Sequence, residues 1–113
     1  MNQTIRMRHS AAGLAALKTE AEGLDFLVAS FGEKAADAFD RAADLVLATS
    51  GRTIVSGMGK SGHIGRKVAA TLSSTGTPAL FIHPAEASHG DLGAITSNDI
   101  LILLSNSGES AEL

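Results

Sequence analysis

Apolar side chains recur at helical spacing over the first fifty residues of the chain. Between residues 11 and 31 they stand three, four and seven positions apart, on one helix face, at Leu14, Leu17, Leu24, Leu27, Val28 and Phe31. Residues 33–49 repeat the pattern with acidic residues between the apolar ones, and Ser50-Gly51 ends it. Residues 1–51 are therefore predicted to form a pair of long helices.

Beyond residue 51 the apolar positions form short runs between glycine-bearing segments. RTIVS (52–56), ALFIH (79–83) and ILILL (100–104) predict three strands, and the third is apolar enough to be buried on both faces. Residues 62–74 return to helical spacing. Residues 52–113 are thus predicted to form an α/β three-layer sandwich with a parallel sheet, flavodoxin-like or Rossmann-like. The helix expected after the third strand has room for about one turn, so we expect only the first half of such a domain, with an exposed apolar face on the third strand.

The composition indicates an ordered globular chain. The 113 residues include 44% hydrophobic and 19% charged residues, carry a net charge of -3 and contain no long basic run, which argues against nucleic acid as a partner. The longest aliphatic run, Ile100–Leu104, is far shorter than the roughly 20 residues that span a bilayer. Without cysteine the chain has neither disulfides nor thiolate metal sites. We expect a cytoplasmic protein that binds neither membrane nor nucleic acid.

The loop GMGKSGHIG (57–65) matches features of several anion-binding sites. A nucleotide phosphate loop requires a glycine five positions before Gly59, where the chain has Ile54. The spacing GxGxxG over residues 57–62 fits a dinucleotide-binding loop, which also needs an acidic residue at the tip of the second strand. That tip reads His83-Pro84, and Glu86 lies further along. The dinucleotide interpretation is weakened and stays open as an alternative.

The loop SNSGES, after the third strand, favours a sugar-phosphate site instead. Its three serines surround a glycine at the tip of a strand, where hydroxyl groups and backbone amides can bind one phosphate group at the start of a helix. A single serine there is more simply explained as a helix cap or turn residue. Three serines in six residues favour a binding role.

Four motifs in this order and spacing resemble one known family. GMGKSGHIG, STGTP, HPAEASHGDLG and SNSGES match the sugar isomerase (SIS) domain of the D-arabinose-5-phosphate isomerases, from about Ile54 to Leu113. The resemblance implies an aldose-ketose isomerase that interconverts D-ribulose 5-phosphate and D-arabinose 5-phosphate, in Kdo synthesis for lipopolysaccharide. It also implies a homotetramer. Family members continue through the rest of the SIS domain and two CBS modules, so we expect this sequence to be their amino-terminal part.

The resemblance assigns roles to individual residues. Three match catalytic positions: Lys60, His89 and Glu112. Substrate or phosphate binding is implied for Ser61, Gly76, Thr77, His89, Ser105, Asn106, Ser107 and Ser110. His83 matches a position associated with zinc, although the reaction itself needs no metal or other cofactor. A non-catalytic SIS module that binds a sugar phosphate for regulation is a further alternative.

The chemistry of isomerisation needs a base at carbon, a group that stabilises an enediolate and a proton shuttle between two oxygens. Glu112 is a candidate for the carbon base. Lys60 can place its positive charge on the oxyanion or on the phosphate. His89 can carry protons between the oxygens, since histidine exchanges protons near neutral pH.

Overall fold

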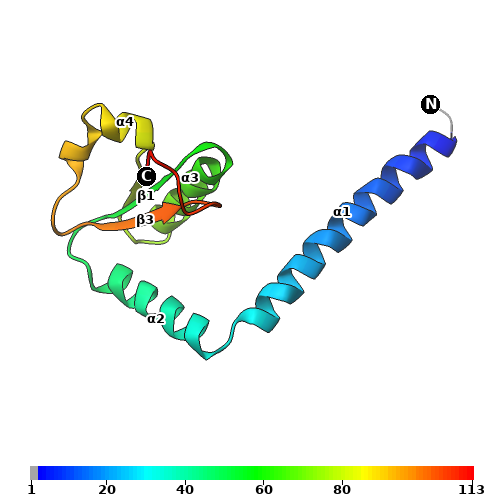
Figure 1. Ribbon diagram of the computed structural model, residues 1–113, viewed down its shortest axis with the longest axis horizontal. Helices are drawn as coiled ribbons and strands as arrows, with labels where there is room; N and C mark the ends of the chain where they lie inside the picture. The colour runs from blue at the N-terminus through cyan, green and yellow to red at the C-terminus, as the bar shows by residue number, and fades with distance from the viewer. Residues whose placement is uncertain (1–2) are drawn as a thin grey trace. The chain divides into compact units, whose positions relative to one another are not determined.

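A computed structural model of the protein describes residues 3–113 (Figure 1). Two helices, α1 (Gln3–Ser30) and α2 (Glu33–Ala48), precede an alternation of strands and helices. In chain order these elements are β1 (Thr53–Gly57), α3 (Gly59–Ser74), β2 (Ala79–Phe81), α4 (Pro84–Ser88), the 3-10 helix η1 (Asp91–Ala94) and β3 (Ile100–Leu104). The predicted α/β class, with two leading helices and a parallel sheet, is confirmed.

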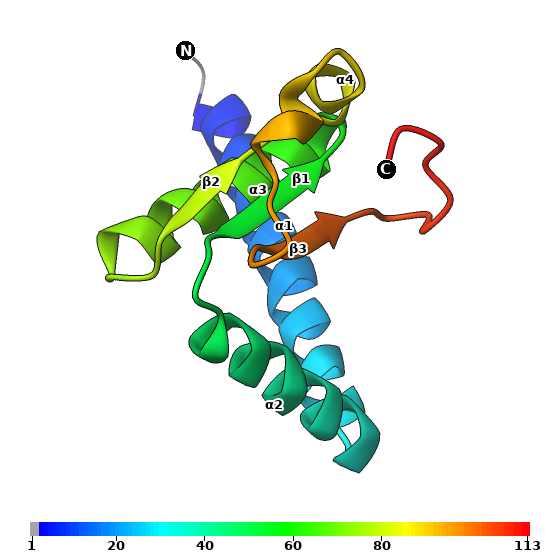
Figure 2. The same ribbon diagram turned by 90° about the vertical axis from the view of Figure 1, so that its left-hand side faces the viewer.

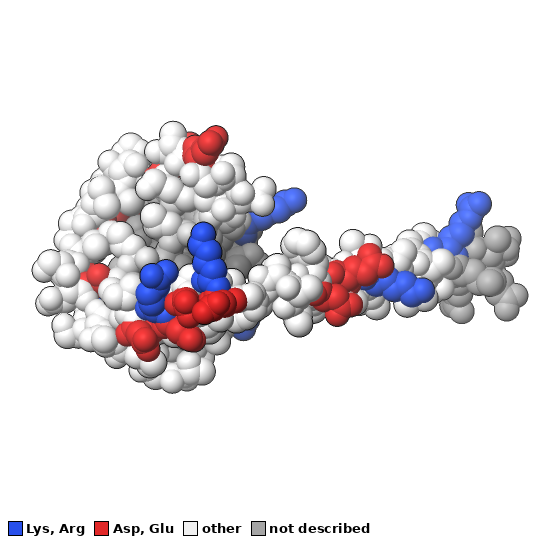
Figure 3. Space-filling view, turned by 60° about the horizontal axis from the view of Figure 1, so that its bottom comes forward, with Lys and Arg blue, Asp and Glu red and all other residues white. Residues whose placement is uncertain are grey.

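The chain divides into two compact units, a helical unit (Met1–Arg41) and a sheet unit (Ala42–Leu113), with the boundary inside α2. In the helical unit, the rings of Phe31 and Phe39 meet edge to face at 5.9 Å across the break between α1 and α2. Five of the six predicted apolar positions lie in α1 and Phe31 follows it, yet every one of the six is more than half exposed. Acidic side chains lie along both helices, whereas charge is sparse on the rest of the surface seen in Figure 3.

The sheet has the order β2-β1-β3 with all strands parallel (Figure 2). The central strand β1 forms the core: Thr53, Ile54, Val55 and Ser56 are all buried. Each predicted strand is present, but β2 ends at Phe81, two residues earlier than predicted. From the central strand β1 the chain passes to β2 at one edge of the sheet and then crosses to β3 at the other edge. Because β1 and β3 are parallel neighbours, the loops that follow them begin beside each other.

Helix α3 covers one face of the sheet through residues without large side chains. Its buried positions are Gly62, Gly65 and Ala69. A Cβ atom on Gly65 would lie 3.0 Å from the ring of Phe81, so the helix backbone rests directly on the strands. The Arg66 guanidinium lies 4.3 Å from the centre of the same ring, a cation–π contact that closes this packing from outside.

At the end of the chain the expected exposed apolar face of the third strand is present, whereas the expected helix is not. Leu101 and Leu103 of β3 are half exposed, because the described residues include no helix that covers their side of the strand. Residues 105–113 form turns rather than a helix. There the Ser105 and Ser107 hydroxyls accept hydrogen bonds from the amides of Gly108 and Glu109. Serine side chains that bind nearby amides in this way compete with helix formation.

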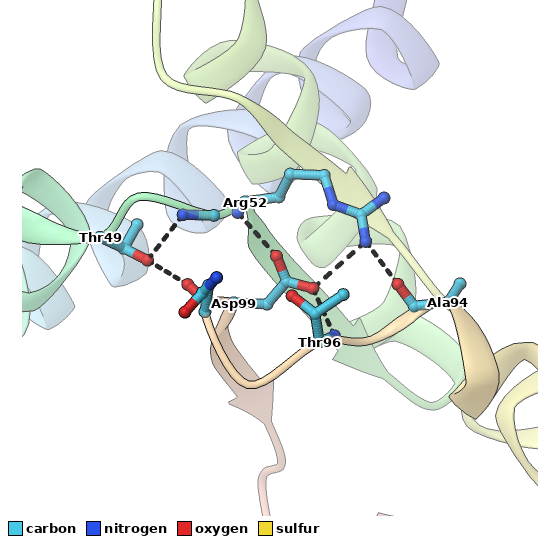
Figure 4. Close-up of polar contacts among 7 residues, drawn as sticks. Thr49, Arg52, Ala94, Thr96 and Asp99 are labelled. Carbon is cyan, nitrogen blue, oxygen red and sulfur yellow. Dashed lines mark hydrogen bonds and ion pairs between the residues drawn. The ribbon is translucent and has the colours of Figure 1, made fainter.

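At the amino-terminal ends of β1 and β3, an ion pair between Arg52 and Asp99 joins the two strands (Figure 4). The sequence gives no reason to expect this pair. The Asp99 carboxylate accepts the amides of Arg52 and Thr96, each at 2.8 Å, and the Arg52 guanidinium at 3.2 Å. The same guanidinium donates to the carbonyl of Ala94, and the Thr49 hydroxyl donates to the carbonyl of Asn98. Hydrogen bonds from the backbone amides of Thr96 and Arg52 hold the pKa of Asp99 well below its usual range, and the hydrogen bond from the Arg52 guanidinium lowers it further.

Candidate functional site

The strand order brings the carboxyl ends of β1 and β3 together, and the space between the loops that follow them is called the crevice below. In an open parallel sheet of order 2-1-3, the connections leave in opposite directions at this point, and ligands bind there. Gly57 at the end of β1 pairs with Leu104 at the end of β3. The loops GMGKSGHIG and SNSGES therefore begin side by side, as the sequence predicts.

The first wall of the crevice is the amino terminus of α3. Met58 is its N-cap residue and makes no side-chain hydrogen bond, so no side chain caps the first amides of the helix. Gly59 turns the chain into the helix with φ of 55°, a conformation that favours glycine. Lys60 is exposed and Ser61 half-buried in the first turn. The helix dipole and the Lys60 ammonium both make this end of α3 attractive to an anion.

The second wall is the serine loop after β3. Ser105 Oγ accepts the Gly108 amide at 2.9 Å and lies 3.4 Å from Ser110 Oγ. Ser107 Oγ accepts the Glu109 amide at 3.1 Å. Asn106 is exposed at the start of the loop. Two of the hydroxyl groups predicted to bind phosphate, those of Ser105 and Ser110, thus lie together, and those of Ser105 and Ser107 bind the loop's own amides.

The third loop, after β2, carries both candidate histidines at the two ends of α4. His83 is the N-cap residue of this short helix, and its Nδ1 accepts the amide of Ala85 at 3.1 Å. Its half-buried ring meets the edge of Phe81 at 6.4 Å. His89 is the exposed C-cap residue, and its amide donates to the carbonyl of Glu86.

Glu112 lines a cavity of about 170 Å³ on the sheet face opposite α3. The lining is apolar except for the side chains of Ser56, Ser88 and Glu112. Neither Ser56 nor Ser88 is among the predicted site residues. The available signal for Ser56 is its position two residues after Ile54, on the same strand face near the end of β1. Lys60 and His89 do not line this cavity.

Gly76 and Thr77 lie at the other end of the sheet, where β2 begins. Helix α3, about 24 Å long from its 16 residues, separates them from Lys60. They end this helix: Gly76 has φ of 98°, its amide donates to Ser73, and the Thr77 amide donates to Leu72 at 2.9 Å. This is the Schellman arrangement of a helix C-terminus. Within one chain, these two residues do not join the loops around Lys60.

In the described part of the chain, no group of three or more His, Cys, Asp or Glu side chains is placed to hold a metal ion. The same residues include no helix long and apolar enough to cross a bilayer. The zinc expected at His83 stays a prediction.

Comparison with known proteins places this arrangement in a family. The model of the SIS domain matches residues 46–113, which include the whole sheet and all three loops. The chain belongs to the SIS-domain family. The arabinose 5-phosphate isomerase KdsD of Pseudomonas aeruginosa is 52% identical to the chain. The alignment covers the whole chain and 33% of the length of KdsD. The arabinose 5-phosphate isomerase GutQ of Escherichia coli K12 is 59% identical over 72% of the chain and 25% of its own length.

A solved structure agrees with this assignment. The Escherichia coli CFT073 protein c3406, in complex with arabinose 5-phosphate, superposes on 99% of the chain and 56% of its own, with a TM-score of 0.75 and 38% identity. The chain therefore shares its fold with this protein. It spans about a third or less of the length of the two isomerases.

Proposed function

We propose that the full-length protein carrying this chain is an aldose-ketose isomerase that interconverts D-ribulose 5-phosphate and D-arabinose 5-phosphate without a metal or other cofactor. The observation that carries the proposal is the start of α3, which has no side-chain cap at Met58, bears Lys60 and Ser61, and begins beside the serine loop at the Gly57–Leu104 pair. Relatives that are 52% and 59% identical to the chain are named arabinose 5-phosphate isomerases, which supports the substrate.

Phosphate binding follows from the electrostatics of this crevice. The first amides of α3 have no partner inside the helix and point along its positive end. Hydroxyl groups at Ser61, Ser105, Ser107 and Ser110 can donate to phosphate oxygens from both walls. A phosphate ester that bridges the two loops would satisfy donors from each, and its charge would be offset by Lys60.

The chemical step needs groups that reach the sugar carbons while the phosphate is held. A carboxylate at Glu112 would remove the proton from C2 of the aldose, and an enediolate would form as the C1 carbonyl gains electron density. Lys60 would stabilise that oxyanion, and His89 would move a proton between O1 and O2. Return of the proton to C1 gives the ketose. Lys60 lies in the first turn of α3, His89 at the end of α4 and Glu112 in the turn at the end of the chain, so the proposed mechanism requires them to meet around the bound substrate.

The test compares two lysines of the same helix in the full-length protein. Lys60→Met removes the charge from the crevice, whereas Lys67→Met removes a charge exposed about two turns further along α3. Loss of one stabilising group at the reacting oxygen lowers kcat by roughly 10²–10³-fold. We expect this loss for Lys60→Met and near wild-type turnover for Lys67→Met, measured by arabinose 5-phosphate formation.

Three results would change the assignment. Wild-type turnover in Lys60→Met would remove this lysine from the chemistry. Binding of pentose phosphate with no turnover by the wild type would instead support a regulatory SIS module that senses the sugar phosphate. Binding of a nicotinamide or flavin dinucleotide with no affinity for pentose phosphates would support the dinucleotide alternative.

We further propose a cytoplasmic homotetramer that supplies arabinose 5-phosphate for Kdo and lipopolysaccharide synthesis. The exposed apolar side chains of α1, which include Leu14 and Leu24, support an assembly in which neighbouring subunits cover them, as does the exposed ring of Phe31 directly after the helix. Light scattering on the full-length protein measures the subunit number, and a monomer at micromolar concentration would refute the tetramer.

A further inference from the structure

The His83 side chain is held in a geometry that differs from that of a metal ligand. Its Nδ1 atom accepts the amide hydrogen of Ala85 at 3.1 Å, which satisfies one of the free donors in the first turn of α4. A ring nitrogen that accepts a hydrogen bond carries no proton, so the proton of the neutral ring lies on Nε2.

A zinc ion does not fit this ring as it stands. Histidine ligands of metals normally donate the hydrogen of their other ring nitrogen to a carbonyl, carboxylate or water. At His83 that other nitrogen, Nδ1, faces a donor. Binding of zinc at Nε2 would transfer the ring proton to Nδ1 and place it against the Ala85 N–H, whereas binding at Nδ1 would displace the same amide. Either mode breaks the cap.

We propose that His83 is a positioning residue, which caps α4 and thereby fixes the place of His89, and that zinc competes with this cap. Only the five residues Pro84–Ser88 separate the two histidines. Pro84 is fully buried, and the Ser88 hydroxyl donates to its carbonyl at 3.1 Å, so the helix is anchored at its start. Displacement of the cap would loosen the turn that leads to His89. The catalytic consequence rests on the proposed isomerase, whereas the cap itself does not.

The experiment separates capping from zinc binding with two substitutions at His83. Asparagine is among the best N-cap residues but has no imidazole to bind zinc, whereas alanine can neither cap the helix nor bind zinc. His63→Ala serves as the control, because His63 is an exposed histidine on α3 outside the cap. In the full-length protein, hydrogen exchange of the amides at 85–89 is measured by mass spectrometry, with and without Zn²⁺. Zinc affinity is measured in parallel by competition with a chromophoric chelator.

Loss of the cap should speed exchange in segment 85–89 roughly five-fold in His83→Ala, the factor that corresponds to about 1 kcal/mol. His83→Asn and His63→Ala should stay within about two-fold of wild type, on the same scale. Zn²⁺ at concentrations that occupy the wild-type ring should speed exchange there. His83→Asn should keep the wild-type kcat, and His83→Ala should lower kcat more than it changes KM.

Two results would overturn the proposal. Equal exchange in His83→Asn and His83→Ala would show that the side chain does not cap α4. Tight zinc binding that depends on His83 and slows exchange in segment 85–89 would show that the ring is a metal ligand compatible with the helix. The exchange readout does not depend on turnover, so failure of the isomerase proposal would leave the cap result standing.

Discussion

Substitution of Gly62 by alanine tests whether the glycine loop is required for packing as well as for binding. Gly62 lies in the first turn of α3 and is buried. A Cβ atom there would stand 2.5 Å from the carbonyl oxygen of Gly57 and 3.3 Å from its carbon, far inside van der Waals contact. Gly57 cannot yield easily, because it is buried in the central strand and paired with Leu104.

Two effects of opposite sign determine the size of the change. Alanine is the better helix residue by about 0.5–1 kcal/mol, which would stabilise α3. Overpacking of a rigid site costs about 1–3 kcal/mol. The upper part of this range applies here, because the clash is with backbone. We therefore expect Gly62→Ala to lower the free energy of unfolding by about 2 kcal/mol, the overpacking cost less the propensity gain.

Urea unfolding followed by circular dichroism measures this change, as a fall of about 1 M in the midpoint at an m-value of about 2 kcal/mol/M. Gly65→Ala is a graded control in the same helix, because its Cβ would meet ring and methyl atoms at 3.0–3.2 Å that can shift. Gly23→Ala in α1 would meet nothing within 4 Å. We expect Gly23→Ala to be the most stable of the three variants, Gly65→Ala to be intermediate and Gly62→Ala to be the least stable. A Gly62→Ala protein as stable as wild type would refute the packing argument.

Two further substitutions test the polar contacts of the sheet unit. Asp99→Asn should destabilise the protein at pH 7 and match wild type more closely near pH 3. The pKa of Asp99 is lower in the folded protein than in the unfolded chain, where it is about 3.9. The charged carboxylate therefore stabilises the fold at pH values above about 3.9, and this stability is lost as the pH falls toward the folded-state pKa. Parallel pH profiles of the denaturation midpoint for the two proteins would contradict this. Ser56→Ala removes a buried hydrogen bond of 2.6 Å to the Ile82 carbonyl and should cost about 1–3 kcal/mol. Ser73→Ala removes an exposed bond of 2.7 Å to the Ala79 carbonyl and should cost far less, so equal losses in thermal unfolding would be evidence against the burial argument.

The order of elements could be predicted from sequence because each has a local cause. Apolar runs rich in β-branched residues marked β1 and β3 to within a residue, and Gly76 marked the end of α3. What could not be predicted depends on contacts between distant residues. The Arg52–Asp99 pair joins positions 47 residues apart. The hydrogen bond from the Ser56 hydroxyl to the Ile82 carbonyl joins positions 26 residues apart.

The candidate site was predictable to the extent that it follows strand ends. Lys60, Ser61 and the serines of SNSGES come from loops that the parallel order brings to one edge of the sheet. Motif order alone could not show that Gly76 and Thr77 lie at the opposite end of the strands, before the start of β2. Nor could it show that Glu112 shares a cavity with Ser56 and Ser88, since that depends on how the chain folds after β3.

The two walls of the crevice are prepared for a ligand to different degrees. The start of α3 has no side-chain cap, so its amides can meet an anion without first losing a protein partner. In the serine loop, the amides of Gly108 and Glu109 already donate to Ser105 and Ser107. A phosphate can use these amides only if the hydroxyl groups turn away and donate to it in their place. Each such exchange replaces one hydrogen bond by another and gains little by itself. The affinity for phosphate should therefore come mainly from α3 and Lys60, and the serine loop should contribute selectivity for a group that accepts several hydrogen bonds at once.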